Sequence, residues 1–135
     1  MKTVITFGTF DLLHIGHIRI INRAREYGDR LVVGVSTDAL NFSKKGFYPI
    51  YNQDDRAEIV RNLACVNEVF FEESLEQKLD YIKKYGADIL VMGNDWEGKF
   101  DWCGEGGAGC EVVYLPRTVG ISTTEVKDAI IKRNL

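Results

Sequence analysis

The ten-residue segment 8–17, Gly-Thr-Phe-Asp-Leu-Leu-His-Ile-Gly-His, most constrains what this chain can fold into. It follows an alternating run of β-branched and aromatic residues at 2–7, which is typical of a buried strand. It precedes a stretch at 18–27 whose apolar residues recur at helical spacing. A strand, a glycine turn and a helix therefore meet here, and ligands usually bind at such a carboxyl end of a strand.

The residues of this segment favour binding of a phosphate group. Gly8 lets the backbone come close to a ligand, and Thr9 adds a hydroxyl and an N–H group. Free N–H groups at the start of a helix stabilise an anion. His14 and His17, the two histidines of the sequence, flank Gly16 at a spacing that puts both imidazoles on one side of a helical turn. We expect the glycine to leave room for a bulky phosphate.

The alternatives to a phosphate site are local hydrogen bonding, a zinc site, a dinucleotide site and a P-loop. Both histidines could simply make local hydrogen bonds at a helix start. Zinc is disfavoured, because no Cys, Asp or Glu stands nearby at a familiar ligand spacing. A dinucleotide site would need Gly-x-Gly-x-x-Gly after the first strand, and a P-loop would need Gly-Lys-Ser/Thr; the sequence contains neither.

Composition limits the class of protein. A chain of 135 residues is expected to form one domain, 1–135, and 45% hydrophobic with 27% charged residues is ordinary for a soluble protein. A net charge of −3 argues against a broad nucleic-acid surface. Cys65, Cys103 and Cys110 form no Cys-x-x-Cys pair, which favours reduced thiols and a cytoplasmic protein. No run of apolar residues approaches the roughly 20 residues that a membrane span needs, so membrane insertion is not expected.

The remaining sequence alternates between strand and helix patterns. Strands are predicted after the first one at 30–36, 67–71, 88–92 and 111–115, and helices at 54–64, 75–85 and 122–133. The segment 37–53 has no clear period and is predicted to be a mobile loop, and 93–109 a glycine-rich loop with a functional role. This order predicts an α/β fold, a Rossmann-like, doubly wound, five-stranded parallel sheet.

A second strand–loop–helix junction lies at 116–124, and it is expected at the same edge of the sheet. Arg117 offers a planar fork of donors for phosphate oxygens. Gly120 permits an unusual backbone turn. A plain N-cap explains Ser122 and Glu125, which form a capping-box pattern, but it explains neither the arginine nor three consecutive hydroxyl residues.

The two junctions resemble the His-x-Gly-His and Arg-Thr-x-Gly-Ile-Ser-Thr-Thr signatures of cytidylyltransferases, in the nucleotidyltransferase superfamily. The resemblance is closest to the glycerol-3-phosphate cytidylyltransferases and covers almost the whole chain, including a Met-Gly-Asn-Asp-Trp-Glu-Gly-Lys-Phe-Asp segment at 92–101. It implies transfer of CMP from CTP to glycerol 3-phosphate, giving CDP-glycerol and pyrophosphate. It also implies Mg²⁺ carried mainly by the nucleotide, a homodimer, and a product used for a cell-envelope polymer such as teichoic acid or capsule.

The same resemblance implies roles for individual residues. Those expected in catalysis are His14, His17, Lys44 and Arg117. Those expected to bind the nucleotide are Gly8, Thr9, Phe10, Ile15, Gly16, Lys45, Asp95, Trp96, Thr118, Val119, Gly120, Ile121, Ser122, Thr123 and Thr124. Those expected to bind the acceptor are Lys44, Lys78, Arg56, Asp11 and Asp38.

The chain also departs from the family pattern. Asn94 stands where the family has aspartate, Ala64 where it has arginine and Asn67 where it has aspartate, and Gly104–Gly109 lengthens a loop. These changes leave other acceptors open: ethanolamine phosphate, another polyol phosphate, or a heptose phosphate used with ATP. A CTP-sensing module without catalysis is a further alternative, whereas a purely structural oligomer subunit would leave both phosphate loops unexplained.

Overall fold

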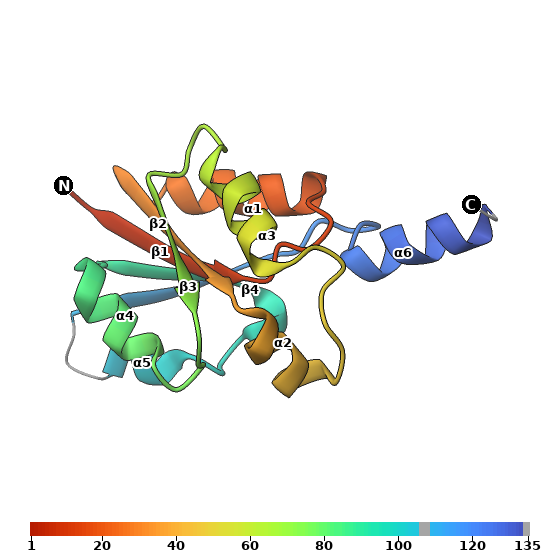
Figure 1. The fold of residues 1–135 in the computed structure, drawn as a ribbon. Coiled ribbons are helices and arrows are strands. Elements are labelled where there is room, and N and C mark those ends of the chain that lie inside the picture. The colour runs from red at the N-terminus through yellow and green to blue at the C-terminus, as the bar shows by residue number, and fades with distance from the viewer. Residues whose placement is uncertain (106–108, 134–135) are drawn as a thin grey trace.

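The computed structural model describes residues 1–105 and 109–133. In this part of the chain, parallel strands form one five-stranded sheet in the order β3-β2-β1-β4-β5 (Figure 1). The strands are β1 (Thr3–Gly8), β2 (Arg30–Ser36), β3 (Glu68–Glu72), β4 (Ile89–Gly93) and β5 (Glu111–Leu115). The predicted α/β fold with a five-stranded parallel sheet is therefore confirmed.

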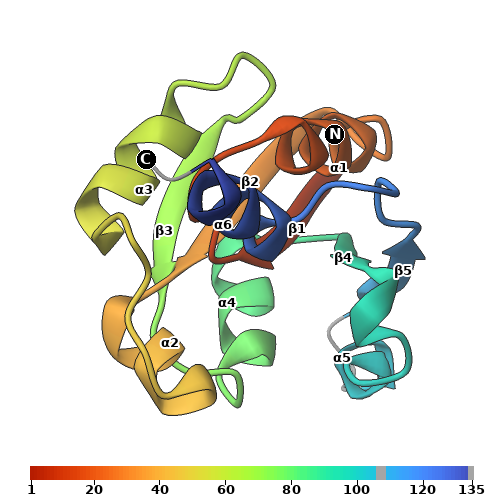
Figure 2. The same cartoon turned by 90° about the vertical axis from the view of Figure 1, so that its right-hand side faces the viewer.

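Helices lie on both faces of this sheet. They are α1 (Ile15–Arg25), α2 (Asp38–Lys45), α3 (Gln53–Arg61), α4 (Lys78–Tyr85), α5 (Asp101–Glu105) and α6 (Thr123–Lys132), with a 3₁₀ turn η1 (Asn94–Trp96). Helices α1 and α3 cover one face and α4 and α5 the other, whereas α6 projects away from the sheet (Figures 1 and 2). None of the helices in the described ranges is long and apolar enough to cross a membrane.

The core consists of two layers because successive strand residues point to opposite faces. The layer under α1 and α3 contains Val4, Ile21, Ala24, Val33, Val60 and Val91. The layer under α4 and α5 contains Ile5, Val32, Ile82, Leu90, Met92, Phe100 and Cys103. Burial on both sides explains the continuous apolar runs of β2 and β4.

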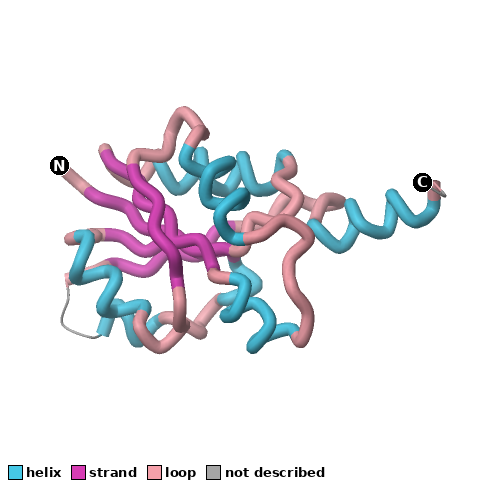
Figure 3. Tube along the Cα trace, in the orientation of Figure 1, coloured by secondary structure: helices cyan, strands magenta, loops and turns pink. Residues whose placement is uncertain are grey.

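The prediction of a mobile loop over 37–53 was wrong, because part of it forms α2. The Thr37 hydroxyl accepts a hydrogen bond from the Leu40 N–H at 3.1 Å and caps the helix start. Gly46 ends the helix in the left-handed conformation, with φ 79°. The segment 46–52 that follows has no helix or strand (Figure 3).

The loop predicted over 93–109 also contains regular structure, namely η1 and α5. Residues 106–108 of the Gly104–Gly109 insertion lie outside the described residues. Cys65, Cys103 and Cys110 are free thiols, in agreement with the predicted reduced state.

Candidate active site

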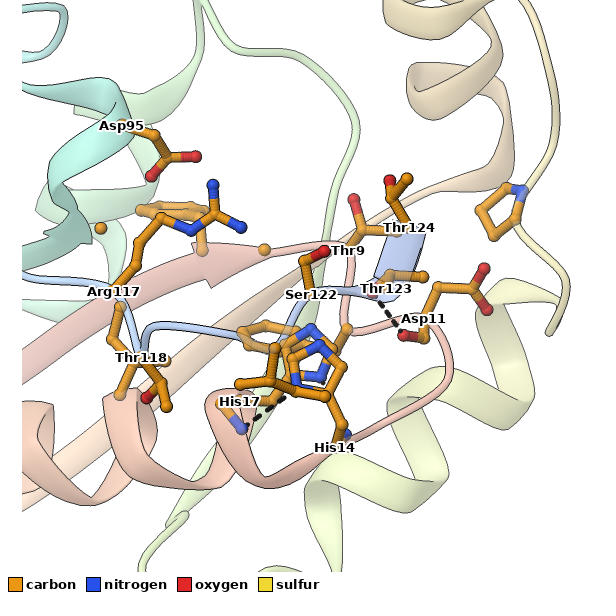
Figure 4. A pocket seen from close by; sticks show the side chains of 18 of the residues that line it. Thr9, Asp11, His14, His17, Asp95, Arg117, Thr118, Ser122, Thr123 and Thr124 are labelled. Carbon is orange, nitrogen blue, oxygen red and sulfur yellow. Dashed lines mark hydrogen bonds between the residues drawn. The ribbon is translucent and has the colours of Figure 1, made fainter. Parts of the chain in front are cut away.

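The connectivity of the sheet creates a crevice beside β1. The chain runs outward from β1 through β2 to β3, then crosses back to β4 on the other side of β1 and continues to β5. Helices on opposite sides leave a crevice at the carboxyl ends of the two strands where the order reverses. A cavity of about 340 Å³ lies there, next to the ends of β1 and β4 and the starts of α1 and α6 (Figure 4).

This cavity brings together most of the predicted site. The predicted residues that line it are Gly8, Thr9, Phe10, Asp11, His14, Gly16, His17, Lys45, Asp95, Trp96, Arg117, Thr118, Ile121, Ser122, Thr123 and Thr124. Two turns about a hundred residues apart in sequence thus converge, and the imidazoles share one cavity with the guanidinium of Arg117.

The two histidines are fixed by hydrogen bonds at the start of α1. Nδ1 of His14 accepts from the Gly16 N–H at 3.0 Å, and Nδ1 of His17 accepts from the His14 N–H at 3.1 Å. The two rings stack with centroids 3.8 Å apart. A backbone N–H only donates, so each Nδ1 is unprotonated and each neutral ring carries its proton on Nε2. The local hydrogen bonds therefore leave the Nε2–H donors free for a ligand.

Both rings are held in the uncharged form. Burial lowers the pKa of His17 to about 4, with a further lowering by His14 and an opposing effect of Asp11. Burial and the Arg117 guanidinium also lower the pKa of His14, against the effect of Glu125. At neutral pH the pair therefore supplies neutral donors, while the positive charge in the cavity comes from other side chains.

The glycines of the first turn serve packing. A Cβ on Gly16 would lie 2.8 Å from Cε1 of His14 and 3.2 Å from Cγ2 of Ile121, so the space beside Gly16 is filled, not left open for phosphate as we expected. A Cβ on Gly8 would lie 2.8 Å from the Phe10 ring. Because Gly16 has no side chain, the first turn can pack closely against Ile121 of the second turn.

Asp11 ties three segments together. Its two carboxylate oxygens accept from the N–H groups of Ile50 and Tyr51, at 2.8 and 2.9 Å. Its carbonyl oxygen accepts from the Thr123 hydroxyl at 3.1 Å. The residues on either side of Asp11 have φ values of 54° and 49°, which are uncommon for residues other than glycine. The structure thus gives Asp11 the role of holding the turn in a strained shape.

The second turn presents its donors at the start of α6. Ser122 caps this helix and accepts from the Glu125 N–H at 3.1 Å, which is the N-cap half of the predicted capping box. Gly120 has φ 82°, which is the unusual turn expected there. Val119, 97% exposed, lies outside the cavity, as do Gly120 and the half-exposed Ile15. Their expected nucleotide contacts stay predictions.

The two lysines at the end of α2 differ in position. Lys45 lines the cavity, whereas Lys44 does not. Nζ of Lys44 lies 5.9 Å from the ring centroid of Trp96, which itself lines the cavity. Burial lowers the pKa of Lys44, and the Glu72 carboxylate opposes this lowering. The expected catalytic role of Lys44 stays a prediction.

Lys78 is buried below the cavity. Its Nζ bonds to Glu72 and lies 3.9 Å from the ring centroid of Phe7 and 4.5 Å from that of Phe100. Phe7 lines the cavity and Lys78 does not. The arrangement gives Lys78 a supporting position, and its expected acceptor contact stays a prediction.

Arg56 and Asp38 also lie away from the cavity lining. The guanidinium of Arg56 is fully buried and donates to the carbonyl oxygens of Thr9, Ser36 and Tyr51. It also pairs with Oδ1 of Asp38 at 2.7 Å. Both side chains therefore hold the backbone of the site in place, and their expected acceptor contacts stay predictions.

Several lining residues were missed from the sequence: Phe7, Ile20, Arg23, Asn41, Phe47, Pro49, Met92, Gly93 and Lys127. Lys127 follows Thr123 by four residues, so helical spacing alone could have placed it beside the hydroxyl residues. Its Nζ lies 5.3 Å from the ring centroid of Phe47, which brings the 46–52 segment against α6. Asn41 had no such signal, because α2 was not predicted.

A metal held by the protein alone does not fit the residues that the structure describes. Within them, no three His, Cys, Asp or Glu side chains are grouped to hold a metal ion. Of the carboxylates described at the cavity, Asp11 is committed to two N–H groups, which leaves Asp95. Imidazole, guanidinium, ammonium and N–H donors predominate, and such donors suit the oxygens of phosphates.

Two departures from the family pattern lie far from the cavity. Oδ1 of Asn67 accepts from the Leu31 N–H at 2.9 Å, near the amino end of β2. The cavity lies at the carboxyl ends of the strands. Ala64 follows α3 and precedes β3, on the same side as Asn67. Neither residue lines the cavity, so a direct effect of these two changes on acceptor choice is not supported.

Sequence comparison places the chain among known relatives. A family model described as Cytidylyltransferase-like matches residues 5–129. The glycerol-3-phosphate cytidylyltransferase of Bacillus subtilis is 51% identical over 96% of this chain and 98% of its own length. The glycerol-3-phosphate cytidylyltransferase of Staphylococcus aureus is 47% identical over 96% of each chain.

Solved structures agree with the fold. A lipopolysaccharide core biosynthesis protein from Thermoplasma volcanium superposes with a TM-score of 0.77 at 24% identity, covering 87% of this chain and 98% of that one. A putative nicotinate-nucleotide adenylyltransferase from Vibrio parahaemolyticus gives a TM-score of 0.62 at 22% identity, covering 98% and 89%. These likenesses show that the chain shares its overall fold with both proteins.

Proposed function

This chain belongs to the cytidylyltransferase-like family, and we propose that it is an enzyme that transfers CMP from CTP to glycerol 3-phosphate, giving CDP-glycerol and pyrophosphate. The observation that carries the proposal is the convergence of both signature turns on one cavity at the switch point of the sheet. Near full-length identity of 47 and 51% to two glycerol-3-phosphate cytidylyltransferases supports the choice of substrates.

The proposed reaction is an in-line displacement at the α-phosphorus of CTP. An oxygen of the acceptor phosphate forms the new bond to phosphorus, while the bond from phosphorus to the bridging oxygen of pyrophosphate breaks. A phosphate monoester has a second pKa near 6, so the acceptor is already a nucleophile at neutral pH. No general base is required, and positioning and charge stabilisation supply the catalysis.

Each part of the cavity has a task in this reaction. The Nε2–H groups of His14 and His17 would donate to phosphate oxygens as charge builds up in the transition state. Arg117, with the lysines at the end of α2, would stabilise the charge on the departing pyrophosphate. The N–H groups at the start of α6 would bind a phosphate oxygen. Asp95 and Trp96 would border the base.

Further parts of the proposal concern cofactor and assembly. Mg²⁺ would enter with the nucleotide, bound mainly to its phosphates, and would neutralise part of their charge. We propose that the chain is a single cytidylyltransferase domain that works in the cytoplasm as a homodimer. The apolar side chains of Ile130 and Ile131 support an interface, because α6 exposes them and buries none of its residues.

The test is pyrophosphate release from CTP, GTP, UTP and ATP, each with glycerol 3-phosphate, ethanolamine phosphate, a second polyol phosphate and a heptose phosphate. The proposal expects turnover with CTP and glycerol 3-phosphate above all other pairs, and CDP-glycerol as product. Turnover confined to another pair would refute the substrate assignment. Tight CTP binding with no pyrophosphate release under any pair would favour a CTP-sensing module.

A further inference from the structure

Asn41 is a buried amide that the proposed reaction does not use. Its side chain is 1% exposed, and its Nδ2 donates to the carbonyl oxygens of Thr37 at 2.9 Å and Ser36 at 3.4 Å. Carbonyl oxygens only accept, so the amide nitrogen must face them. The orientation of the amide is therefore fixed, and its oxygen faces Thr9.

Thr9, which lines the cavity, is the hydrogen-bond partner of this oxygen. Its hydroxyl donates to Oδ1 of Asn41 at 2.7 Å. A hydroxyl has one proton, so Oγ1 keeps only its lone pairs for a ligand. The carbonyl oxygen of the same residue accepts from the buried Arg56 at 2.8 Å. Side chains from two helices, α2 and α3, thus hold both the backbone and the hydroxyl of Thr9.

We propose that the Thr9 hydroxyl acts as a hydrogen-bond acceptor that selects a hydroxyl group on the substrate, with Asn41 as the residue that positions it. This deepens the proposed function and rests on it. A phosphate oxygen at neutral pH presents lone pairs, and two lone-pair groups repel each other. Donating to phosphate would require Thr9 to abandon a buried amide oxygen and leave that oxygen without a partner.

The position of Thr9 favours the acceptor as the source of the hydroxyl. In Figure 4, Thr9 lies towards Asp11 and Thr124, away from Asp95 and Arg117 at the other end of the cavity. Glycerol 3-phosphate carries two free hydroxyls beside its phosphate. The ribose of CTP is the other source of the same chemistry, and the two are separable by experiment.

The experiment compares kcat/KM for wild type, Thr9→Val and Thr9→Ser. The acceptors are glycerol 3-phosphate and its two deoxy analogues, propane-1,3-diol phosphate and propane-1,2-diol 1-phosphate. A parallel series compares CTP with 2′-deoxy-CTP and 3′-deoxy-CTP. Thr9→Val keeps the shape of the side chain and removes the hydroxyl, whereas Thr9→Ser retains it. Thermal unfolding of each variant confirms that it is folded.

We expect wild type to prefer glycerol 3-phosphate over one deoxy analogue by at least about tenfold, as one hydrogen bond of about 1.4 kcal/mol implies. Thr9→Val should bring this ratio close to one, and Thr9→Ser should restore it. If Thr9→Val instead abolishes the preference for CTP over one of its deoxy analogues, the selected hydroxyl belongs to the ribose. Unchanged ratios in both series would overturn the proposal. Absence of turnover by the wild type would refute the proposed function. Unchanged ratios would refute only the role of Thr9, because each ratio is measured within one variant.

Discussion

Replacing His17 with asparagine separates two tasks of this side chain. Nδ1 of His17 accepts from the His14 N–H at 3.1 Å, and Nε2 is free to donate into the cavity. The asparagine oxygen occupies nearly the place of Nδ1 and can accept the same hydrogen bond, but nothing in the variant replaces the Nε2–H. His17→Asn should therefore keep the helix cap and lose the donor.

The expected size of each effect follows from this geometry. Loss of one preorganised donor to a developing charge costs about 3–4 kcal/mol, or roughly a hundred- to thousand-fold in kcat. Loss of a capping hydrogen bond costs about 1 kcal/mol of stability. His17→Asn should then show the fall in kcat with an almost unchanged free energy of unfolding, whereas His17→Ala should show both losses.

The assay is steady-state release of pyrophosphate at saturating CTP and glycerol 3-phosphate, with urea unfolding of each variant beside it. Saturation matters because it separates transition-state stabilisation from substrate binding. If His17→Asn turns over within a few-fold of wild type, the histidine is only a helix cap and the reasoning fails. Equal stability losses in the two variants would refute the capping role.

Three further predictions concern pH, a glycine and the arginine. Because the pKa of His17 is about 4 when folded and 6.5 when unfolded, the unfolded state binds the extra proton between these values. The free energy of unfolding should fall as the pH is lowered through that window, by at most about 3 kcal/mol; urea melts should show this pH dependence weakened in His17→Asn, and an identical profile would contradict it. Gly16→Ala, whose Cβ would lie 2.8 Å from the ring of His14, should displace that ring and lower kcat at least about tenfold; wild-type kinetics would show that the contact is unimportant. Arg117→Lys keeps the charge and loses the planar fork, so it should raise the KM for CTP and lower kcat, less than Arg117→Met does; equal kinetics for the two variants would refute a role of the charge.

The strands were predictable because burial on both faces imposes long apolar runs, as in the Leu31-Val32-Val33 stretch of β2. Both site turns were predictable because anion binding requires a recognisable set of donors. Helix α2 escaped prediction, although Thr37 and Gly46 are recognisable cap residues, because it has only 8 residues and buries just Leu40 and Asn41.

The burial of two basic residues could not be predicted from sequence. Lysine and arginine are rarely buried, so a basic side chain implied by the family resemblance was expected to reach the substrate. Lys78 and Arg56 are buried and each pairs with a carboxylate, Glu72 six residues before Lys78 and Asp38 18 residues before Arg56. Such pairing depends on tertiary contacts that no local pattern contains.

Both turns are expected to bind one and the same CTP molecule. A crystal structure of the wild-type protein with CTP would show whether they do. We predict that Nε2 of His14 or His17, and the guanidinium of Arg117, lie within about 3 Å of phosphate oxygens of the same nucleotide. CTP bound outside this cavity, or touched by only one of the two turns, would contradict it.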